Sequence, residues 1–183
     1  MIRTVYARVA GWNAKRYEQE YDAKLAIALL EEELQEWVEA KTPVEQLDAL
    51  CDIAYVAFGV VWKAKTQVDD INKDYHIALD MISLYEQLQY SDIVLHIAGL
   101  IKCLHANHPG RLANLIAVLA LAQMLSMGLT YEQAVEAMHI VCDANDSKSV
   151  TKTASHIKAN KDKGVSFVPP EARLAELLKC AKS

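Results

Sequence analysis

The sequence predicts an all-α protein: a helical bundle followed by a long basic loop and a C-terminal helix. Only six glycines and four prolines occur in 183 residues, so the turn residues that all-β chains need at short intervals are missing. Strong helix formers, Ala, Leu, Glu and Lys, are abundant, and apolar residues recur at helical spacing. With 52% hydrophobic and 23% charged residues, the chain can bury one core, and we expect a single domain over residues 1–183.

The first two helices are expected over residues 6–17 and 22–40. In the second, Leu30, Leu34 and Trp37 lie on one apolar face, and the opposite side is acidic. This pattern is typical of a surface helix that packs against a core through one stripe.

The third helix has a clear start signal. Thr42 is placed to cap it, Pro43 to occupy its first position, and Glu45 to complete a capping box. We expect this helix over residues 43–65, antiparallel to the second because the link between them is short.

The later elements follow from similar local signals. Ser91-Asp92 and Thr130 are expected N-caps, Asn107–Gly110 is expected to form a turn, and Gly128 to end a helix. These signals predict a polar loop over residues 69–74 and helices over residues 77–88, 91–104, 112–127 and 130–144.

The composition changes after residue 144. Residues 145–170 are rich in Asn, Asp, Ser, Thr and Lys and have little apolar periodicity, so they are expected to form a long basic loop. Pro170 then begins a final helix over residues 171–182, with leucines that can pack on the body or on a second subunit.

Charge and targeting signals narrow the partners. A formal net charge of −5 argues against a broad surface for duplex nucleic acid. The N-terminal residues lack the apolar core and cleavage site of a signal peptide, so we expect a cytoplasmic protein. The uncharged stretch over residues 112–130 contains polar residues, and we interpret it as a buried core helix rather than a membrane span.

Five carboxylates form the candidate catalytic centre. Glu32, Glu33 and Glu36 lie within one helical turn, and Asp48 and Asp52 are four residues apart on the next helix. Because the two helices are expected to be antiparallel neighbours, all five side chains can face one another. The alternative is a solvated acidic helix face, with Asp52 paired to a basic residue from elsewhere in the fold.

Asp52 favours a metal site over that alternative. Its sequence neighbours are almost wholly apolar, and the same helix contains no Lys or Arg before Lys63. A buried, unpaired carboxylate is costly, so a cation should neutralise it. An all-carboxylate set suits Mg²⁺, with Mn²⁺ as an alternative ion, and predicts Glu32, Glu33, Glu36, Asp48 and Asp52 as metal ligands.

These two acidic segments resemble a known family. Leu30-Glu31-Glu32-Glu33-Leu34-Gln35-Glu36 and the segment from Leu47 to Gly59 are similar to the paired acidic blocks of the all-α nucleoside triphosphate pyrophosphohydrolases. That superfamily includes MazG, dimeric dUTPases and phosphoribosyl-ATP pyrophosphohydrolases. The resemblance implies a four-helix MazG-like core. One departure is Ala49, where the family usually has Glu, and we expect Asp48 to substitute for it.

A second resemblance lies near the C-terminus. Residues 144–148 and 163–170 are similar to the tail of the phage-type branch of the same superfamily. By that resemblance Asn145, Lys148 and Lys163 would contact the nucleotide or its phosphates. Lysines there are chemically sensible because they offset triphosphate charge that a metal leaves uncompensated. The alternative for any one lysine is a solvated loop residue.

The resemblance implies Mg²⁺-dependent hydrolysis of a nucleoside triphosphate, a deoxynucleotide or a non-standard nucleotide, to the monophosphate and pyrophosphate. Glu33 or Glu36 is the expected general base. We expect the first helix to bind the nucleobase, through stacking on Trp12 and a hydrogen bond to Asn13, although Trp12 can equally be a core residue.

Apolar helices and the assembly of relatives predict a homodimer or homotetramer. Two other readings stay open: a non-catalytic nucleotide-binding or interaction protein derived from this family, and a narrower enzyme of the dUTPase or phosphoribosyl-ATP pyrophosphohydrolase type.

Overall fold

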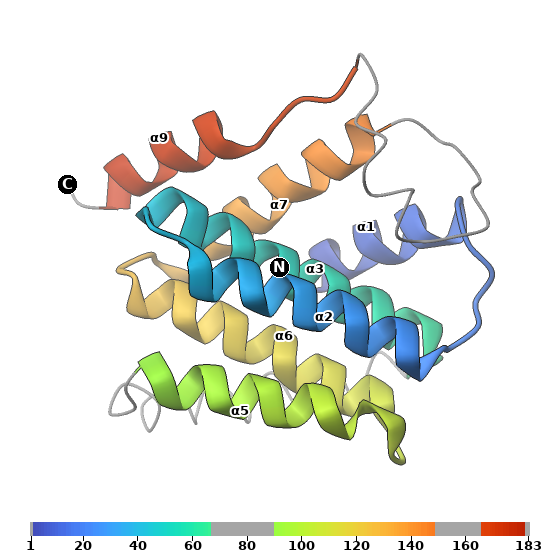
Figure 1. Cartoon of the computed structure of the whole chain (residues 1–183). Helices are drawn as coiled ribbons and strands as arrows, with labels where there is room; N and C mark the ends of the chain where they lie inside the picture. The colour runs from blue at the N-terminus through green and yellow to red at the C-terminus, as the bar shows by residue number, and fades with distance from the viewer. Residues whose placement is uncertain (1, 67–89, 149–165, 182–183) are drawn as a thin grey trace.

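The computed structural model describes residues 2–66, 90–148 and 166–181, and within those ranges it contains helices and loops but no strand. The all-α prediction is confirmed (Figure 1). The elements are α1 (Ile2–Ala14), α2 (Ala23–Glu39), α3 (Pro43–Lys63), α5 (Tyr90–Lys102), the short 3-10 helix η1 (Cys103–His105), α6 (Pro109–Ser126), α7 (Tyr131–Ser147) and α9 (Glu171–Ala181).

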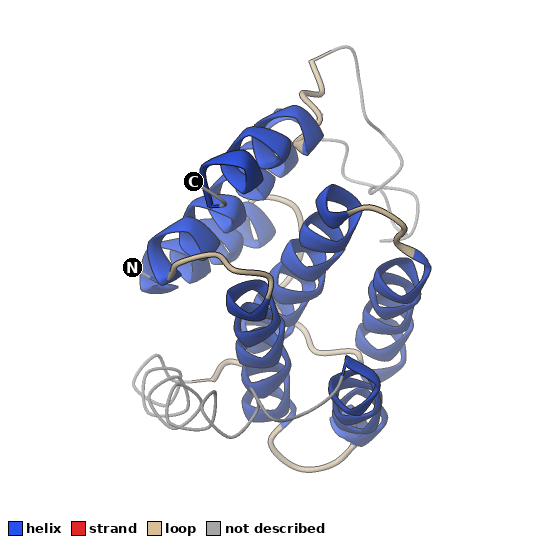
Figure 2. Cartoon of the chain, turned by 90° about the vertical axis from the view of Figure 1, so that its left-hand side faces the viewer, coloured by secondary structure: helices blue, strands red, loops and turns tan. Residues whose placement is uncertain are grey.

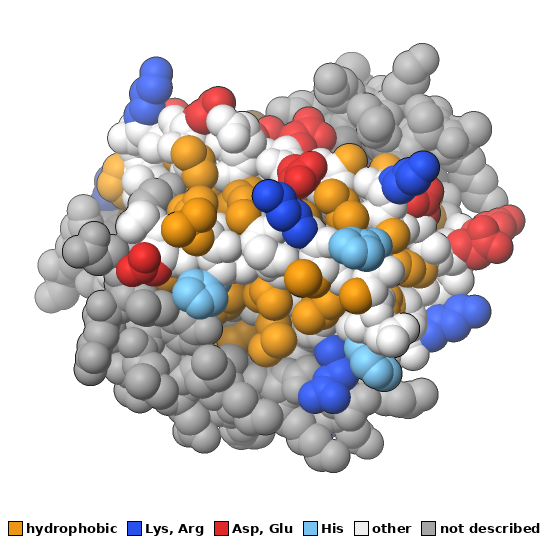
Figure 3. All heavy atoms as spheres, turned by 60° about the horizontal axis from the view of Figure 1, so that its bottom comes forward, with side chains coloured by type: hydrophobic (Ala, Val, Ile, Leu, Met, Phe, Trp, Pro, Cys, Tyr) orange, Lys and Arg blue, Asp and Glu red, His pale blue; other side chains and the backbone are white. Residues whose placement is uncertain are grey.

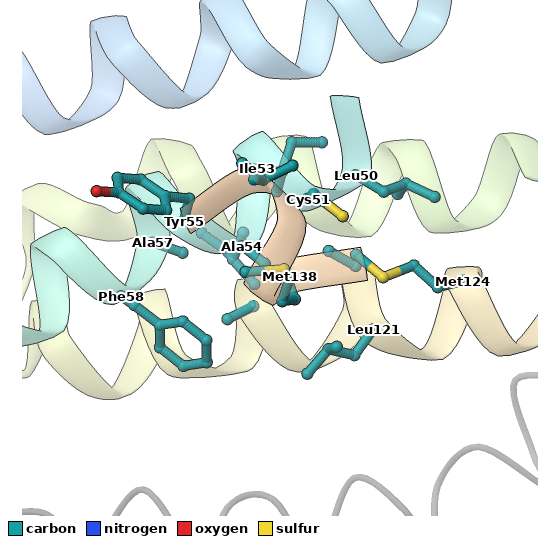
Figure 4. Packing of buried hydrophobic residues seen from close by; sticks show 14 of the residues in the cluster. Leu50, Cys51, Ile53, Ala54, Tyr55, Ala57, Phe58, Leu121, Met124 and Met138 are labelled. Atoms are coloured by element: carbon teal, nitrogen blue, oxygen red, sulfur yellow. The ribbon is translucent and has the colours of Figure 1, made fainter. Parts of the chain in front are cut away.

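Helix α3 is the central element. It contacts α1, α2, α6, α7 and α9, and most of its length is surrounded by other helices (Figures 1 and 2). Its apolar residues recur on several faces, as expected for a helix buried on more than one side. Leu50, Ala54 and Phe58 pack with Met124 of α6 and Met138 of α7 in one cluster (Figure 4). The carboxylates of α3 are therefore held by a helix that packs against five others.

The start of α3 is as the sequence predicts. The Thr42 side chain accepts a hydrogen bond from the Glu45 backbone N–H at 3.2 Å, and the Glu45 carboxylate accepts one from the Thr42 backbone N–H at 2.9 Å. Pro43 occupies the first position of the helix. This capping box fixes the turn between α2 and α3 and makes them the antiparallel neighbours that the acidic blocks require.

The first helix differs from its prediction. It begins by Ile2 and ends at Ala14, whereas residues 6–17 were expected. Its buried side chains, Ile2, Val5, Val9 and Trp12, follow a helical repeat that starts before Tyr6. At the other end, the Asn13 carbonyl accepts hydrogen bonds from the N–H groups of residues 16 and 17, which turns the chain away.

Two predicted boundaries around α5 and α6 are wrong. Ser91 and Asp92 lie inside α5 rather than capping it, because the buried stripe of Ile93, Ile97 and Ile101 belongs to a helix that already includes Tyr90. Residues 109–110 are the first of α6 rather than part of a turn. The expected loop over residues 69–74 and helix over residues 77–88 lie outside the described residues.

The chain turns sharply before α6 and is closely packed at the start of this helix. His108, just before the helix, adopts left-handed backbone angles, with φ of 65°. Gly110 is in the first turn of this helix. A Cβ atom at this position would lie only 1.7 Å from the Thr66 Oγ1 atom, so the close packing requires glycine. At the other end, Gly128 has φ of 94°, a conformation that favours glycine, and ends α6 as predicted.

The last two described helices match their predictions with one extension. Thr130 caps α7 through a capping box with Gln133, but the helix continues to Ser147 instead of ending at residue 144. The first residues assigned to the basic loop are therefore helical, and residues 149–165 of that loop lie outside the described residues. Helix α9 begins at Glu171, directly after Pro170, as predicted.

Helix α6 is the one described helix that is long and apolar enough to cross a membrane. Most of this segment, 61%, is buried inside the bundle, where α6 packs along α3. That burial is the behaviour expected of a core helix, as the sequence predicted.

Candidate active site

All five predicted carboxylates line a single cleft. The cleft has a volume of about 300 Å³, and Glu32, Glu33 and Glu36 of α2 face Asp48 and Asp52 of α3 across it. Ala49 does not line the cleft and is buried in the core. Asp48, the residue before it, lines the cleft and supplies a carboxylate to this wall.

Burial and mutual repulsion change the acidity of two of these groups. The pKa of Glu33 is raised to about 9, first by burial and then by the charges of Asp52, Glu36 and Glu32. The pKa of Asp48 is raised to about 7, first by burial and then by the charges of Asp52, Glu171 and Glu36. Lys148 acts against both shifts. The cleft therefore concentrates more negative charge than the protein itself compensates.

One carboxylate oxygen shows directly that the protein leaves part of this acidic cleft without a partner. The Oδ1 atom of Asp48 is buried and has no hydrogen-bond partner among the described residues. A buried acceptor without a partner is costly, and strongly perturbed carboxyls in a cleft are typical of functional sites.

The oxygen-only donor set fits a hard divalent cation. Within residues 2–66, 90–148 and 166–181, no three Asp, Glu, His or Cys side chains are arranged so that they could hold a metal ion. Mg²⁺ in proteins is commonly held by one or two carboxylates, several waters and substrate phosphates. Such a cation needs few protein ligands, and the carboxylate oxygens that line the cleft are of the type it prefers.

The end of α7 supplies the polar part of the opposite wall. Asn145 is only 5% exposed, and its Nδ2 atom donates to the Val141 carbonyl at 3.0 Å. The Lys148 Nζ atom donates to the Asn145 Oδ1 atom at 2.8 Å and lies 5.9 Å from the centre of the Phe167 ring. Both predicted residues thus line the cleft, with the amide orienting the ammonium. Lys163 lies outside the described residues.

Helix α1 and the turn after it lie beside the end of α7: the Arg16 Nη2 atom donates to the Lys148 carbonyl at 3.3 Å. Asn13 lines the cleft with 6% exposure, and its Nδ2 atom donates to the Val9 carbonyl at 2.9 Å. Trp12 also lines it, but the indole N–H donates to the Asn145 carbonyl at 2.8 Å and the ring packs edge-on against Tyr55. Trp12 thus joins α1 to α7, and stacking of a nucleobase on it stays a prediction.

Polar residues that the sequence did not identify also line the cleft: Tyr17, Tyr21, Asp22, Tyr55, Lys63 and Glu171. Tyr55 lies three residues after Asp52, so helical spacing could have placed both on one face. Its hydroxyl is buried without a hydrogen-bond partner in the described part of the chain, and in Figure 4 it points away from Met124 and Met138. Glu171 gave no local signal because only tertiary packing brings α9 to this cleft.

The acidic blocks on α2 and α3 are the segments whose sequence resembles the MazG-like nucleoside triphosphate pyrophosphohydrolase superfamily. Residues 2–77 match the family model of phosphoribosyl-ATP pyrophosphohydrolase, which belongs to that superfamily. The match includes both acidic blocks and Asn13, and the resemblance predicted from those blocks is confirmed. It ends before residues 144–170, so the phage-type resemblance of the tail stays a prediction. No curated protein and no solved structure matches the chain.

Proposed function

We propose that this protein is a Mg²⁺-dependent hydrolase that cleaves a nucleoside triphosphate, a deoxynucleotide or a non-standard nucleotide, to the monophosphate and pyrophosphate. The observation that carries the proposal is the cleft in which five carboxylates face Asn145 and Lys148. The family match to a nucleotide pyrophosphohydrolase over residues 2–77 supports the same class of reaction.

Each wall of the cleft has a role in this reaction. Glu32, Glu33, Glu36, Asp48 and Asp52 would hold Mg²⁺, or Mn²⁺ in its place. When bound, the ion would offset phosphate charge and lower the pKa of the attacking water. Lys148, oriented by Asn145, would bind phosphate oxygens, as would Lys163. Asn13, which also lines the cleft, would hydrogen-bond the nucleobase.

Hydrolysis requires one proton acceptor. The water oxygen forms a bond to phosphorus, the anhydride bond between the α and β phosphates breaks, and the water proton passes to Glu33 or Glu36. Burial and the charges of Asp52, Glu36 and Glu32 raise the pKa of Glu33, and the charge of Lys148 offsets this only in part, so a bound cation would be needed to keep Glu33 ionised. A carboxylate not fully engaged by a cation can accept this proton.

The family match favours a second, narrower candidate. Phosphoribosyl-ATP is itself an adenine nucleotide with a triphosphate, and the matched model bears the name of the enzyme that hydrolyses it. The same carboxylates would act in that reaction, so the two candidates differ only in the part of the substrate beyond the triphosphate. A dUTPase-like enzyme and a non-catalytic nucleotide-binding protein are the remaining alternatives. We further propose a cytoplasmic homodimer or homotetramer that does not bind duplex nucleic acid or a membrane.

Product analysis tests these candidates together. The purified protein would be incubated with Mg²⁺ and each common ribo- and deoxyribonucleoside triphosphate or phosphoribosyl-ATP, and the products separated by ion-exchange chromatography. We expect monophosphate and pyrophosphate, abolished by EDTA and by Glu36→Gln or Asp52→Asn. Glu39→Gln is the matched control, because Glu39 lies on the same helix but outside the cleft. No product from any substrate would overturn the enzymatic proposal.

A further inference from the structure

We propose that Glu171, in the first turn of α9, is a further acidic residue that holds the divalent cation together with Asp48. This inference rests on the proposed function, since it concerns the cation of the same cleft. It assigns a role in the site to the last described helix, which the two acidic blocks of α2 and α3 do not involve.

The position of Glu171 is the first argument. Helix α9 packs on α3 and α7, and Pro170 and Glu171 line the cleft with Asp48, Asp52 and Lys148. Glu171 therefore faces the cleft from a third helix, beyond the two that carry the acidic blocks. Its own side chain is exposed at the rim, so a long carboxylate can reach inward.

The second argument is that α9 is firmly anchored, which fixes where Glu171 lies. Leu174 is fully buried and Leu178 is 8% exposed, both in the main core cluster. The Arg173 Nη1 atom donates to the Asp143 Oδ2 atom at 2.6 Å, which ties α9 to α7. The Pro170 carbonyl accepts from the N–H groups of Arg173 and Leu174, so the first turn is formed. Side chains held on rigid elements make more precise sites than those on loops.

The third argument is the chemistry of Asp48. Its Oδ1 atom is buried without a hydrogen-bond partner among the described residues, and Asp48 lines the same cleft as Glu171. Two carboxylates that repel each other across a cleft are stabilised together by a divalent cation between them. Aspartate is also one methylene shorter than glutamate, so a second carboxylate from another helix helps to complete the ligand set.

Lys148 offers a competing role for Glu171. It lines the same cleft, and its charge acts on Asp48 as well. If Glu171 served only to position Lys148, its loss would weaken binding of a nucleotide and leave binding of the cation unchanged. The two roles therefore differ in a measurement that needs no substrate.

The test is direct titration with Mn²⁺ in the absence of nucleotide, with free Mn²⁺ measured from its EPR signal. We expect Glu171→Gln to bind Mn²⁺ about tenfold more weakly than the wild type, and Glu171→Asp to be intermediate. Glu176→Gln, an exposed glutamate of the same helix that lies outside the cleft, should bind like the wild type. Far-UV circular dichroism of each variant checks that the helices are retained.

Two results would overturn the inference: unchanged Mn²⁺ affinity in Glu171→Gln, or a wild type that binds no Mn²⁺. Hydrolysis of nucleoside triphosphates is measured separately on the same preparations. A wild type that hydrolyses nucleotide while Glu171→Gln keeps its Mn²⁺ affinity would reject the role of Glu171 and leave the proposed function standing. A wild type that binds Mn²⁺ through Glu171 but does not hydrolyse any nucleotide would support the role of Glu171 and reject the proposed function.

Discussion

Glu33 and Asp48 are partly buried acids whose protons affect the stability of the whole fold. Their pKa values are about 9 and about 7 in the folded protein, against ordinary values of 4.5 and 3.8. Between pH 4 and pH 9 the folded chain therefore binds more protons at these two sites than the unfolded chain does. The free energy of unfolding should then fall as the pH rises through the folded pKa values.

We predict that, in EDTA, raising the pH from 5 to 9 lowers the free energy of unfolding by several kcal/mol. Urea denaturation at each pH measures it. Glu33→Gln should remove much of this dependence, whereas Glu39→Gln, on the solvent side of the same helix, should retain it. Mg²⁺ should reduce the fall, because a bound cation favours the ionised carboxylates. A wild-type stability independent of pH in EDTA would contradict the prediction.

The residues of the site differ in whether their positions could be predicted from the nearby sequence. Asp52 was identifiable because apolar neighbours left it no solvated position, and Asp48 followed from helical spacing. Asn145 and Lys148 came from the resemblance of the tail, and the structure places both in the cleft. Glu171 could not be found in this way, because its place depends on the packing of α9 against α3 and α7.

At the scale of the helices, Asp143 of α7 forms ion pairs that connect this helix to α1 and to α9. Its Oδ1 atom accepts from Arg8 of α1 at 2.7 Å, and its Oδ2 atom accepts from Arg173 of α9 at 2.6 Å. Arg8 also donates to Asp146 at 2.6 Å, near the end of α7. The ions are partly exposed, so each pair contributes modestly, but together they link the three helices that flank the cleft.

We predict that Asp143→Asn lowers the free energy of unfolding by about 1 kcal/mol and increases hydrogen exchange in α9. Denaturant titration and exchange monitored by mass spectrometry measure the two effects. Glu136→Gln is the matched control on α7, because its contact with Arg173 is long, at 3.9 Å, and its loss should change little. Unchanged exchange in α9 would show that the leucines alone hold this helix.

The helix boundaries show where local chemistry is sufficient. The starts of α3 and α7 were predicted from capping boxes, and both boxes are present because their hydrogen bonds involve residues only three apart. The starts of α1 and α5 were misplaced, because there the helix extends wherever an apolar stripe meets the core. Ile2 of α1 and Ile93 of α5 are buried by other helices, which a local signal does not report.

At the scale of the whole molecule, exposed hydrophobic side chains are relevant to whether the protein forms a homo-oligomer. Hydrophobic side chains gather in the middle of the face shown in Figure 3, and Leu95 of α5 is 69% exposed. Val38 of α2 is 46% exposed. Exposed apolar surface of this kind is often covered by another subunit.

We predict a homodimer or homotetramer, with a solution mass two or four times the 20.4 kDa of the chain. Light scattering coupled to size-exclusion chromatography measures the mass, and a dilution series distinguishes a stable assembly from weak association. A mass of one chain at all concentrations would contradict the prediction.

The fold class was predictable because it depends on composition and periodicity averaged over many residues. The arrangement of the helices was less accessible. Helix α6 was expected to be buried, but its packing along α3 follows from which apolar faces fit one another. That complementarity is a property of the assembled molecule.

The cleft draws its walls from α1, α2 and α3 near one end of the chain and from α7 and α9 near the other. This wide separation has a kinetic consequence. During synthesis the acidic hairpin of α2 and α3 emerges well before α7, and about 80 further residues must follow Lys63 before Asn145 and Lys148 can face it. Contacts so distant in sequence form late, because closing the long intervening loop costs entropy before any packing compensates it. Competence to bind a ligand should therefore be among the last properties that a newly made chain acquires.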